Sequence, residues 1–199
     1  MIRKQLRPAI VMTLVLCVLT GLVYPGIVTG LAQTLFPRQA NGSLIEVNGK
    51  VVGSALIGQT FTQPYYFHSR PSAAGAGYDG TASAGTNKGP TDRKLADTLI
   101  AQAVEAAVSS EGATKGQIPA DMVTSSASGL DPHISPATAR LQVRRVSAAR
   151  HASPASIQAL VDAHTEGRQF GVFGDPRVNV LRLNLALDSA FARPAGGTR

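Results

Sequence analysis

The chain has 199 residues, of which 44% are hydrophobic and 5% aromatic, and it carries a formal charge of +7. That length leaves room for one domain beyond a membrane segment, with a core built mainly from aliphatic side chains. The basic residues form no cluster interleaved with aromatic residues, which excludes the usual pattern of a nucleic-acid-binding protein. Cys17 is the only cysteine, so the sequence excludes a disulfide-stabilised fold.

The run from Pro8 to Pro37 contains no charged side chain. A helix needs about 20 apolar residues to cross the hydrocarbon core of a bilayer, so the run predicts one transmembrane helix over residues 9–36. A cleaved secretory signal is the alternative, with Gly30-Leu31-Ala32 as a small-residue cleavage site. The apolar part of such a signal spans only about 7–15 residues, so the length favours a retained anchor.

The basic flank of this run lies before it, at Arg3, Lys4 and Arg7, whereas a single arginine follows closely. Basic flanks of membrane helices stay in the cytoplasm. We therefore expect residues 1–8 to form a cytoplasmic N-terminus and residues 38–199 to form one extracytoplasmic, periplasmic-side domain.

Three residues inside the predicted span suggest a neighbour in the membrane. Gly26 and Gly30 form a GxxxG pair, which lets another helix approach the backbone closely. Pro25 is expected to kink or locally unwind the helix and leave a carbonyl for a neighbour to satisfy.

The segment after the anchor begins with a predicted hairpin and a long loop. Asn48-Gly49 lies between two β-favouring stretches within residues 44–57, and this pair tolerates a type I′ turn. Residues 58–91 are rich in Gly, Ser, Thr and Ala, which indicates either a functional loop or disorder. Tyr65-Tyr66-Phe67 and Arg70 favour the ordered loop, because aromatic side chains need packing partners.

Helices are predicted in the second half from apolar periodicity and from capping residues followed by proline. We expect a mixed α+β outer domain with a small sheet. The expected helices are residues 91–110, Pro136 to about Ala149, Pro154 to Glu166 closed by Gly167, and Pro176 to about Phe191, with a loop-like segment from Gly112 to Asp131.

No catalytic, cofactor or metal site is evident in this sequence. Gly75 to Gly80 matches GxGxxG, but no strand precedes it and no helix follows, so these are loop glycines. The alternative function is a membrane-anchored serine hydrolase that uses Ser128 or Ser135 with His133. A structural interpretation competes with it, in which Asp131 and His133 fix a tight turn through side chain to backbone bonds.

Four stretches of the sequence carry a resemblance to a known family. They are Gly58–Phe61, Tyr66–Ala73, Ala120–Ser135 and Arg177–Asn184. These stretches resemble the C subunit of the Kdp-type potassium-transporting ATPase, and the resemblance extends over the whole chain. One departure is visible at Ser83–Pro90, where the family's usual Ser-Gly-Gly-Ser-Asn-Leu-Gly-Pro is replaced by Ser-Ala-Gly-Thr-Asn-Lys-Gly-Pro.

The resemblance implies an accessory, non-catalytic subunit of a bacterial inner-membrane complex for potassium uptake. Its implied partners are a potassium-channel-like subunit, a P-type ATPase subunit and a small membrane subunit, and the complex handles ATP and potassium. The C subunit is expected to be needed for assembly and to act as a catalytic chaperone that raises the ATP affinity of the ATPase subunit.

The charge bias puts the outer domain opposite to cytoplasmic ATP, so we expect that effect to be indirect. The anchor would pack on partner helices, and the outer domain would cap the potassium entrance of the channel-like subunit. The residues expected to contact other subunits are Pro25, Gly26, Gly30, Gln59, Tyr66, Arg70, Asn87, Asp131, His133 and Asn179.

Overall fold

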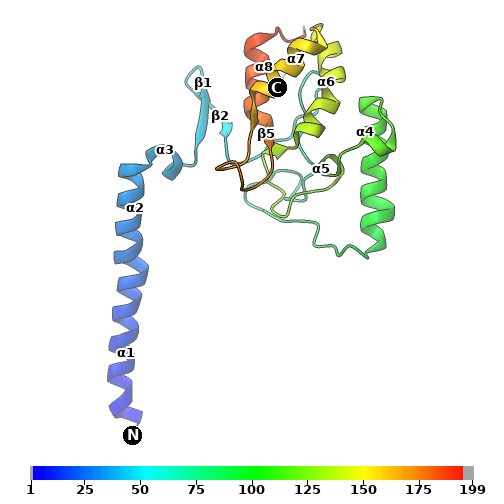
Figure 1. Ribbon diagram of the computed structural model, residues 1–199. Helices are drawn as coiled ribbons and strands as arrows, with labels where there is room; N and C mark the ends of the chain where they lie inside the picture. The colour runs from blue at the N-terminus through cyan, green and yellow to red at the C-terminus, as the bar shows by residue number, and fades with distance from the viewer. Residues whose placement is uncertain (1, 195–199) are drawn as a thin grey trace. The chain divides into compact units, whose positions relative to one another are not determined.

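The computed structural model describes residues 2–194, and side chains from Lys4 onward. The chain forms two compact units, an N-terminal one to Val52 and a second one from Gly53 (Figure 1). Met1 and residues 195–199, which are the ends of the expected N-terminus and outer domain, lie outside the described residues.

The N-terminal unit begins with one long helix. Helix α1 (Ile2–Val18) passes through a π-helical turn (Leu19–Val23) into α2 (Tyr24–Leu35). Pro25 lacks an N–H and its ring clashes with the preceding turn. The helix accommodates it by widening, so that the N–H of Tyr24 bonds to the carbonyl of Leu19. Residues Lys4–Leu35 are long and apolar enough to cross a membrane.

A short helix, α3 (Pro37–Ala40), leads to a two-stranded sheet of β1 (Leu44–Val47) and β2 (Lys50–Ser54). Asn48 and Gly49 join the strands with φ of 53° and 74°, the left-handed values that a type I′ turn requires. The predicted hairpin is confirmed.

The second unit is a mixed α+β fold, as expected. Its three-stranded antiparallel sheet has the order β3-β5-β4, with His133 opposite Asn179 and Thr165 opposite Val178. After the long loop come a π-helical segment (Lys94–Ile100), α4 (Ala101–Glu111), a 3₁₀ turn (Lys115–Gln117), α5 (Ala120–Val123), β3 (His133–Ile134), α6 (Pro136–Arg150), α7 (Pro154–Ala163), β4 (Thr165–Glu166), β5 (Arg177–Asn179) and α8 (Val180–Ala190).

The core lies where α6, α7 and α8 pack on this sheet (Figure 1). The Ser-Pro starts of α6 and α7 are confirmed, since Ser135 and Ser153 accept bonds from the N–H groups of Thr138 and Ser156. The fully buried side chains of the core include Phe67, Val146, Ile157, Val178, Leu183 and Leu187.

Two predicted helix boundaries are wrong. The helix expected to reach Glu166 ends at Ala163, because the following residues pair with β5 instead. The last helix begins at Val180 and not at Pro176, because Asn179 accepts the capping bond from the N–H of Arg182 at 3.1 Å. Asp175 pairs instead with Arg168, Nη2 to Oδ1, at 3.2 Å.

The loop of residues 58–91 pairs with no neighbouring strand of the described residues at Phe67 and His68. Side-chain amides form the hydrogen bonds to its backbone there. Asn184 accepts from the N–H of Phe67 and donates to its carbonyl, both at 2.9 Å. Gln142 brackets His68 in the same way, at 2.7 and 3.2 Å. Each amide satisfies both polar groups of one residue, which is how an extended loop can pass through the core.

Candidate subunit-contact site

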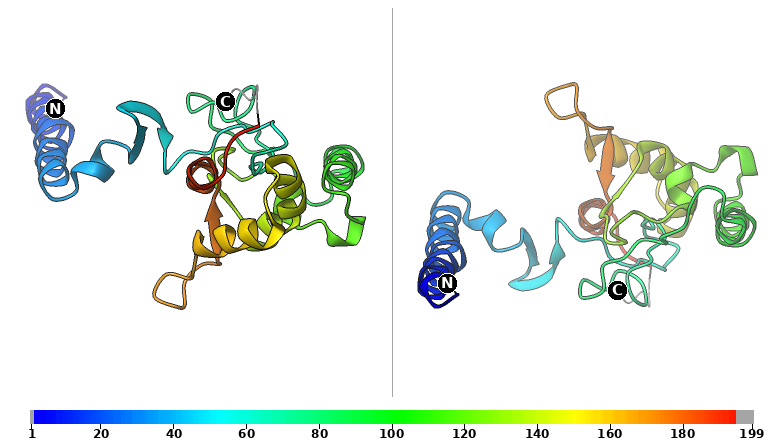
Figure 2. Two further views of the ribbon diagram at one scale, coloured as in Figure 1. Left: turned by 90° about the horizontal axis from the view of Figure 1, so that it is seen from above. Right: turned by 90° about the horizontal axis from the view of Figure 1, so that it is seen from below.

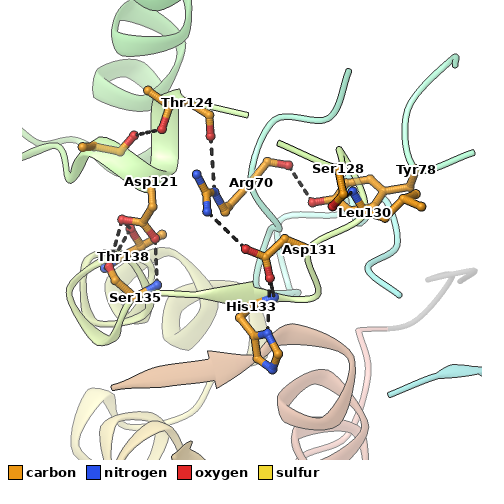
Figure 3. Close-up of polar contacts among 11 residues, drawn as sticks. Arg70, Tyr78, Asp121, Thr124, Ser128, Leu130, Asp131, His133, Ser135 and Thr138 are labelled. Carbon is orange, nitrogen blue, oxygen red and sulfur yellow. Dashed lines mark hydrogen bonds and ion pairs between the residues drawn. The ribbon is translucent and has the colours of Figure 1, made fainter. Parts of the chain in front are cut away.

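Arg70 of the long loop meets Asp131, just before β3 (Figure 3). Arg70 Nη1 donates to Asp131 Oδ2 at 3.1 Å, and its Nε donates to the carbonyl of Thr124 at 3.3 Å. Asp131 Oδ1 accepts from the backbone N–H of His133 at 3.0 Å and lies 3.2 Å from the ring Nδ1. The hydroxyl of Tyr78 donates to the carbonyl of Arg70 at 2.8 Å. These contacts, which we call the Arg70–Asp131 cluster, join the long loop, the segment at Thr124 and the segment before β3.

The carboxylate of Asp131 is half-buried and ionised in this setting. Burial alone would raise its pKa. Hydrogen bonds from the side chain and backbone of His133, together with the positive charge of Arg70, hold the pKa of Asp131 below its usual value. The cluster is thus held together by charge-assisted hydrogen bonds at neutral pH.

Further hydrogen bonds hold the segment before Asp131 against the long loop. Ser72 Oγ donates to the carbonyl of Gly129 at 2.6 Å, and the N–H of Ala84 donates to the carbonyl of Ser128 at 3.0 Å. Gly129 has φ of +68°, and a Cβ there would lie 2.6 Å from the carbonyl oxygen of Ala84. The divergent stretch at residues 83–90 therefore still packs against this segment.

The serines of the hydrolase alternative are engaged elsewhere. Ser128 Oγ accepts from the N–H of Leu130 at 3.1 Å. Ser135 Oγ donates to Asp121 Oδ1 at 2.9 Å, and Asp121 Oδ2 accepts from the N–H of Ser135 at 2.7 Å. A nucleophile must be hydrogen-bonded to its base, whereas His133 contacts Asp131. The predicted Asp131–His133 turn is confirmed, and the hydrolase alternative is not favoured.

The remaining candidates in the second unit occupy different settings. Tyr66 and Asn179 are buried; Tyr66 donates its hydroxyl to Asp188 at 2.9 Å, and Asn179 caps α8. The side chain of Gln59 lies over Gly53. Asn87 is exposed and has φ of 52°.

The candidates in the span are exposed within the N-terminal unit. Gly26 and Gly30 have no described atom within 4 Å of where a Cβ would stand, and Pro25 is the second residue after the π-helical turn. Among the described residues, no group of three or more His, Cys, Asp or Glu is placed to hold a metal ion.

One buried group was not singled out from the sequence. The guanidinium of Arg150 donates to the carbonyl of Tyr65 at 2.9 Å and to Asp188 at 2.7 Å, and it lies 5.1 Å from the centre of the Tyr66 ring. A basic residue at the end of a helix usually stays in solvent. The sequence gives no signal for this pairing, because the partners are 85 and 38 residues away.

A hollow of about 380 Å³ gives solvent access to the Arg70 side of the cluster, between the loop and α4. Its lining includes Arg70, Pro71 and Ala107, and a second, largely apolar hollow of about 440 Å³ continues past Pro71 to Leu99. Alanines form much of this face of α4, so the helix meets the loop without filling the space between them.

Comparison with known proteins agrees with the resemblance. The family model described as K+-transporting ATPase, c chain (KdpC), matches residues 6–189. Similar proteins are the potassium-transporting ATPase KdpC subunits of Gemmatimonas aurantiaca (64% identity over 95% of this chain and 94% of that protein) and Koribacter versatilis (54%, over 96% and 98%). That of Myxococcus xanthus is 59% identical over 87% of this chain and 82% of its own length. The chain belongs to the KdpC family, the C subunits of the potassium-transporting ATPase.

Proposed function

We propose that the chain is a non-catalytic accessory subunit that assembles the complex and raises the ATP affinity of its ATP-hydrolysing subunit. The observation that carries this is the family match over residues 6–189, which includes both the apolar helix and the folded unit. The geometry is consistent with it, because the charged side chains of the Arg70–Asp131 cluster bind one another and the backbone.

The folded unit is proposed to lie on the extracytoplasmic side. The basic residues before the apolar helix support that orientation by the positive-inside rule. ATP is then on the other side of the bilayer, and the effect on ATP affinity must be a coupling between distant sites. Such couplings are typically about 1–3 kcal/mol, or about 5- to 150-fold in affinity.

The anchor is proposed to carry part of this coupling by packing on membrane helices of the other subunits. Gly26 and Gly30 present open backbone on one face, and the π-helical turn before Pro25 is irregular backbone at membrane depth. Irregular backbone is tolerated in the hydrocarbon core where protein covers it. A partner helix against this face would provide that cover.

The folded unit is proposed to cap the potassium entrance of the channel-like subunit. The long loop is fastened at Phe67, at His68 and at the Arg70–Asp131 cluster, so it presents a defined surface. Exposed Asn87 in this loop and part-exposed His133 in β3 remain candidates for direct contact.

The test is Gly26→Leu combined with Gly30→Leu in the full complex. We expect loss of the chain during purification through the ATPase subunit, and no growth at micromolar potassium. Val28→Phe is the control, since it adds four carbons, as each Gly→Leu change does, but on the opposite face of the helix. Intact co-purification of the double variant would contradict the packing proposal while leaving the family assignment untouched.

A further inference from the structure

The segment between β4 and β5 ends in an apolar tip that nothing in the family assignment explains. Phe170 is 94% exposed, and Val172 and Phe173 are 69% and 66% exposed. Both views in Figure 2 show this segment as a loop that stands out from the rest of the second unit. Single exposed apolar residues are ordinary, but three at one projecting tip mark an interaction site.

The fold holds this tip in one shape. The backbones of Gln169 and Phe173 exchange two hydrogen bonds, both of 2.9 Å. The base of the loop is closed by the Arg168–Asp175 ion pair at 3.2 Å. Phe170 itself has φ of 53°, a left-handed conformation that bulky residues avoid. The chain thus accepts backbone strain while it presents an aromatic ring to its surroundings.

The tip is rooted beside the point where the chain from the apolar helix enters this unit. The loop continues directly into β5, and Asn179 at the end of β5 donates its amide to the carbonyl of Ala55 at 2.9 Å. Residues 36–54 separate the apolar helix from Ala55, and a chain extends at most about 3.5 Å per residue. Ala55 therefore stays within about 70 Å of the end of the helix, and the root of the loop is one short strand, β5, away from it.

We propose that the tip of residues 169–173 inserts into the headgroup and upper acyl region of the bilayer that holds the apolar helix. The size of the tip favours lipid over a protein surface. Two Phe and one Val bury at most about 600 Å², whereas a stable protein interface takes about 800 Å² from each partner. A bilayer does not require a complementary surface. The covalent link to the apolar helix also keeps the tip at a high effective concentration near the bilayer. This inference depends on the membrane helix and not on which complex the chain joins.

The test uses the absence of tryptophan from the chain. The full-length F170W variant, reconstituted without other subunits in phosphatidylcholine and phosphatidylglycerol nanodiscs, places one indole at the tip. We expect blue-shifted emission and strong quenching by lipids brominated near the headgroup end of the acyl chains. K115W is the control, because Lys115 is 73% exposed in the turn after α4, which both views of Figure 2 place away from the loop. Its emission should stay red-shifted and unquenched.

A second variant separates insertion from any change of fold. Adding Val172→Asp to F170W puts a charge into the tip without touching the core, and it should abolish the quenching while the far-UV circular dichroism stays unchanged. Water-like emission of F170W with no bromine quenching would overturn the proposal. A blue shift that appears only after the other subunits are added would also overturn it and assign the tip to a subunit interface.

Discussion

Arg70 and Asp131 lie 61 residues apart in the sequence and form an ion pair of 3.1 Å. The pair ties the long loop to the segment that leads into β3. Asp131 also holds the backbone N–H of His133, so one carboxylate fixes both a long-range contact and a local turn.

Asp131→Ala is expected to lower the free energy of unfolding by about 1–3 kcal/mol, because it leaves the half-buried guanidinium of Arg70 without its charged acceptor. Thermal unfolding of the full chain in detergent, followed by near-UV circular dichroism of its tyrosines, measures this. The control is Asp175→Ala, whose carboxylate is 88% exposed and whose loss should cost less than about 1 kcal/mol. Equal effects of the two variants would remove the central role given to Asp131.

Acid should destabilise the second unit through His68. Burial, and then the nearby charge of Arg145, lowers the pKa of this histidine from 6.5 to about 4. Because the unfolded chain binds the proton near pH 6.5 and the folded chain only near pH 4, the free energy of unfolding falls as pH drops between these values. The loss is at most about 3 kcal/mol. Urea titrations at several pH values should show this slope, and His68→Gln should flatten it; an unchanged slope would contradict the assignment.

Gly129→Ala is expected to be among the most damaging single substitutions. The added Cβ would meet the carbonyl oxygen of Ala84 at 2.6 Å and the nitrogen of Ala74 at 2.7 Å, and the backbone φ of +68° disfavours alanine. Overpacking against backbone costs about 1–3 kcal/mol in addition to the left-handed strain. Gly116→Ala, which has open space, should change the melting temperature little. Similar melting temperatures for the two variants would show that the loops can separate freely.

Arg150→Met is expected to lower the free energy of unfolding by about 3–5 kcal/mol, because it removes the buried cation that faces Asp188 and the donor that satisfies the carbonyl of Tyr65. Arg140→Met is the control, since its pair with Asp162 is exposed and 3.8 Å long. Its cost should be below about 1 kcal/mol. Thermal unfolding of the full chain in detergent compares the two variants. A small effect of Arg150→Met would mean that Arg193 alone is able to neutralise Asp188.

Local rules predicted the parts of the fold that depend on neighbouring residues. The apolar run, the Asn48-Gly49 turn and the two Ser-Pro helix starts each follow from interactions over a few residues, and all are present. The Asp131–His133 turn belongs to the same class, because its hydrogen bond spans two residues.

The features that the sequence did not predict depend on contacts between residues far apart in the chain. Pro176 is typical of a helix start, but the residues that follow it form β5. Asn179 is both the last residue of that strand and the N-cap of α8. The amides of Gln142 and Asn184 sit on helices with no local sign that each will bracket a loop residue 74 or 117 positions away. The family resemblance pointed to Arg70 and Asp131, but only the tertiary structure shows that they bind each other.

The proposed coupling across the bilayer requires the folded unit to lie outside the cytoplasm. Cys17 lies in the apolar helix and is the only cysteine, so Cys17→Ser with Lys115→Cys gives one reactive thiol on the exposed turn after α4. The measurement is labelling of this variant by a membrane-impermeant maleimide in spheroplasts, before and after lysis. We predict full labelling before lysis. Labelling only after lysis would place the unit beside ATP, and direct nucleotide contact would replace coupling across the bilayer.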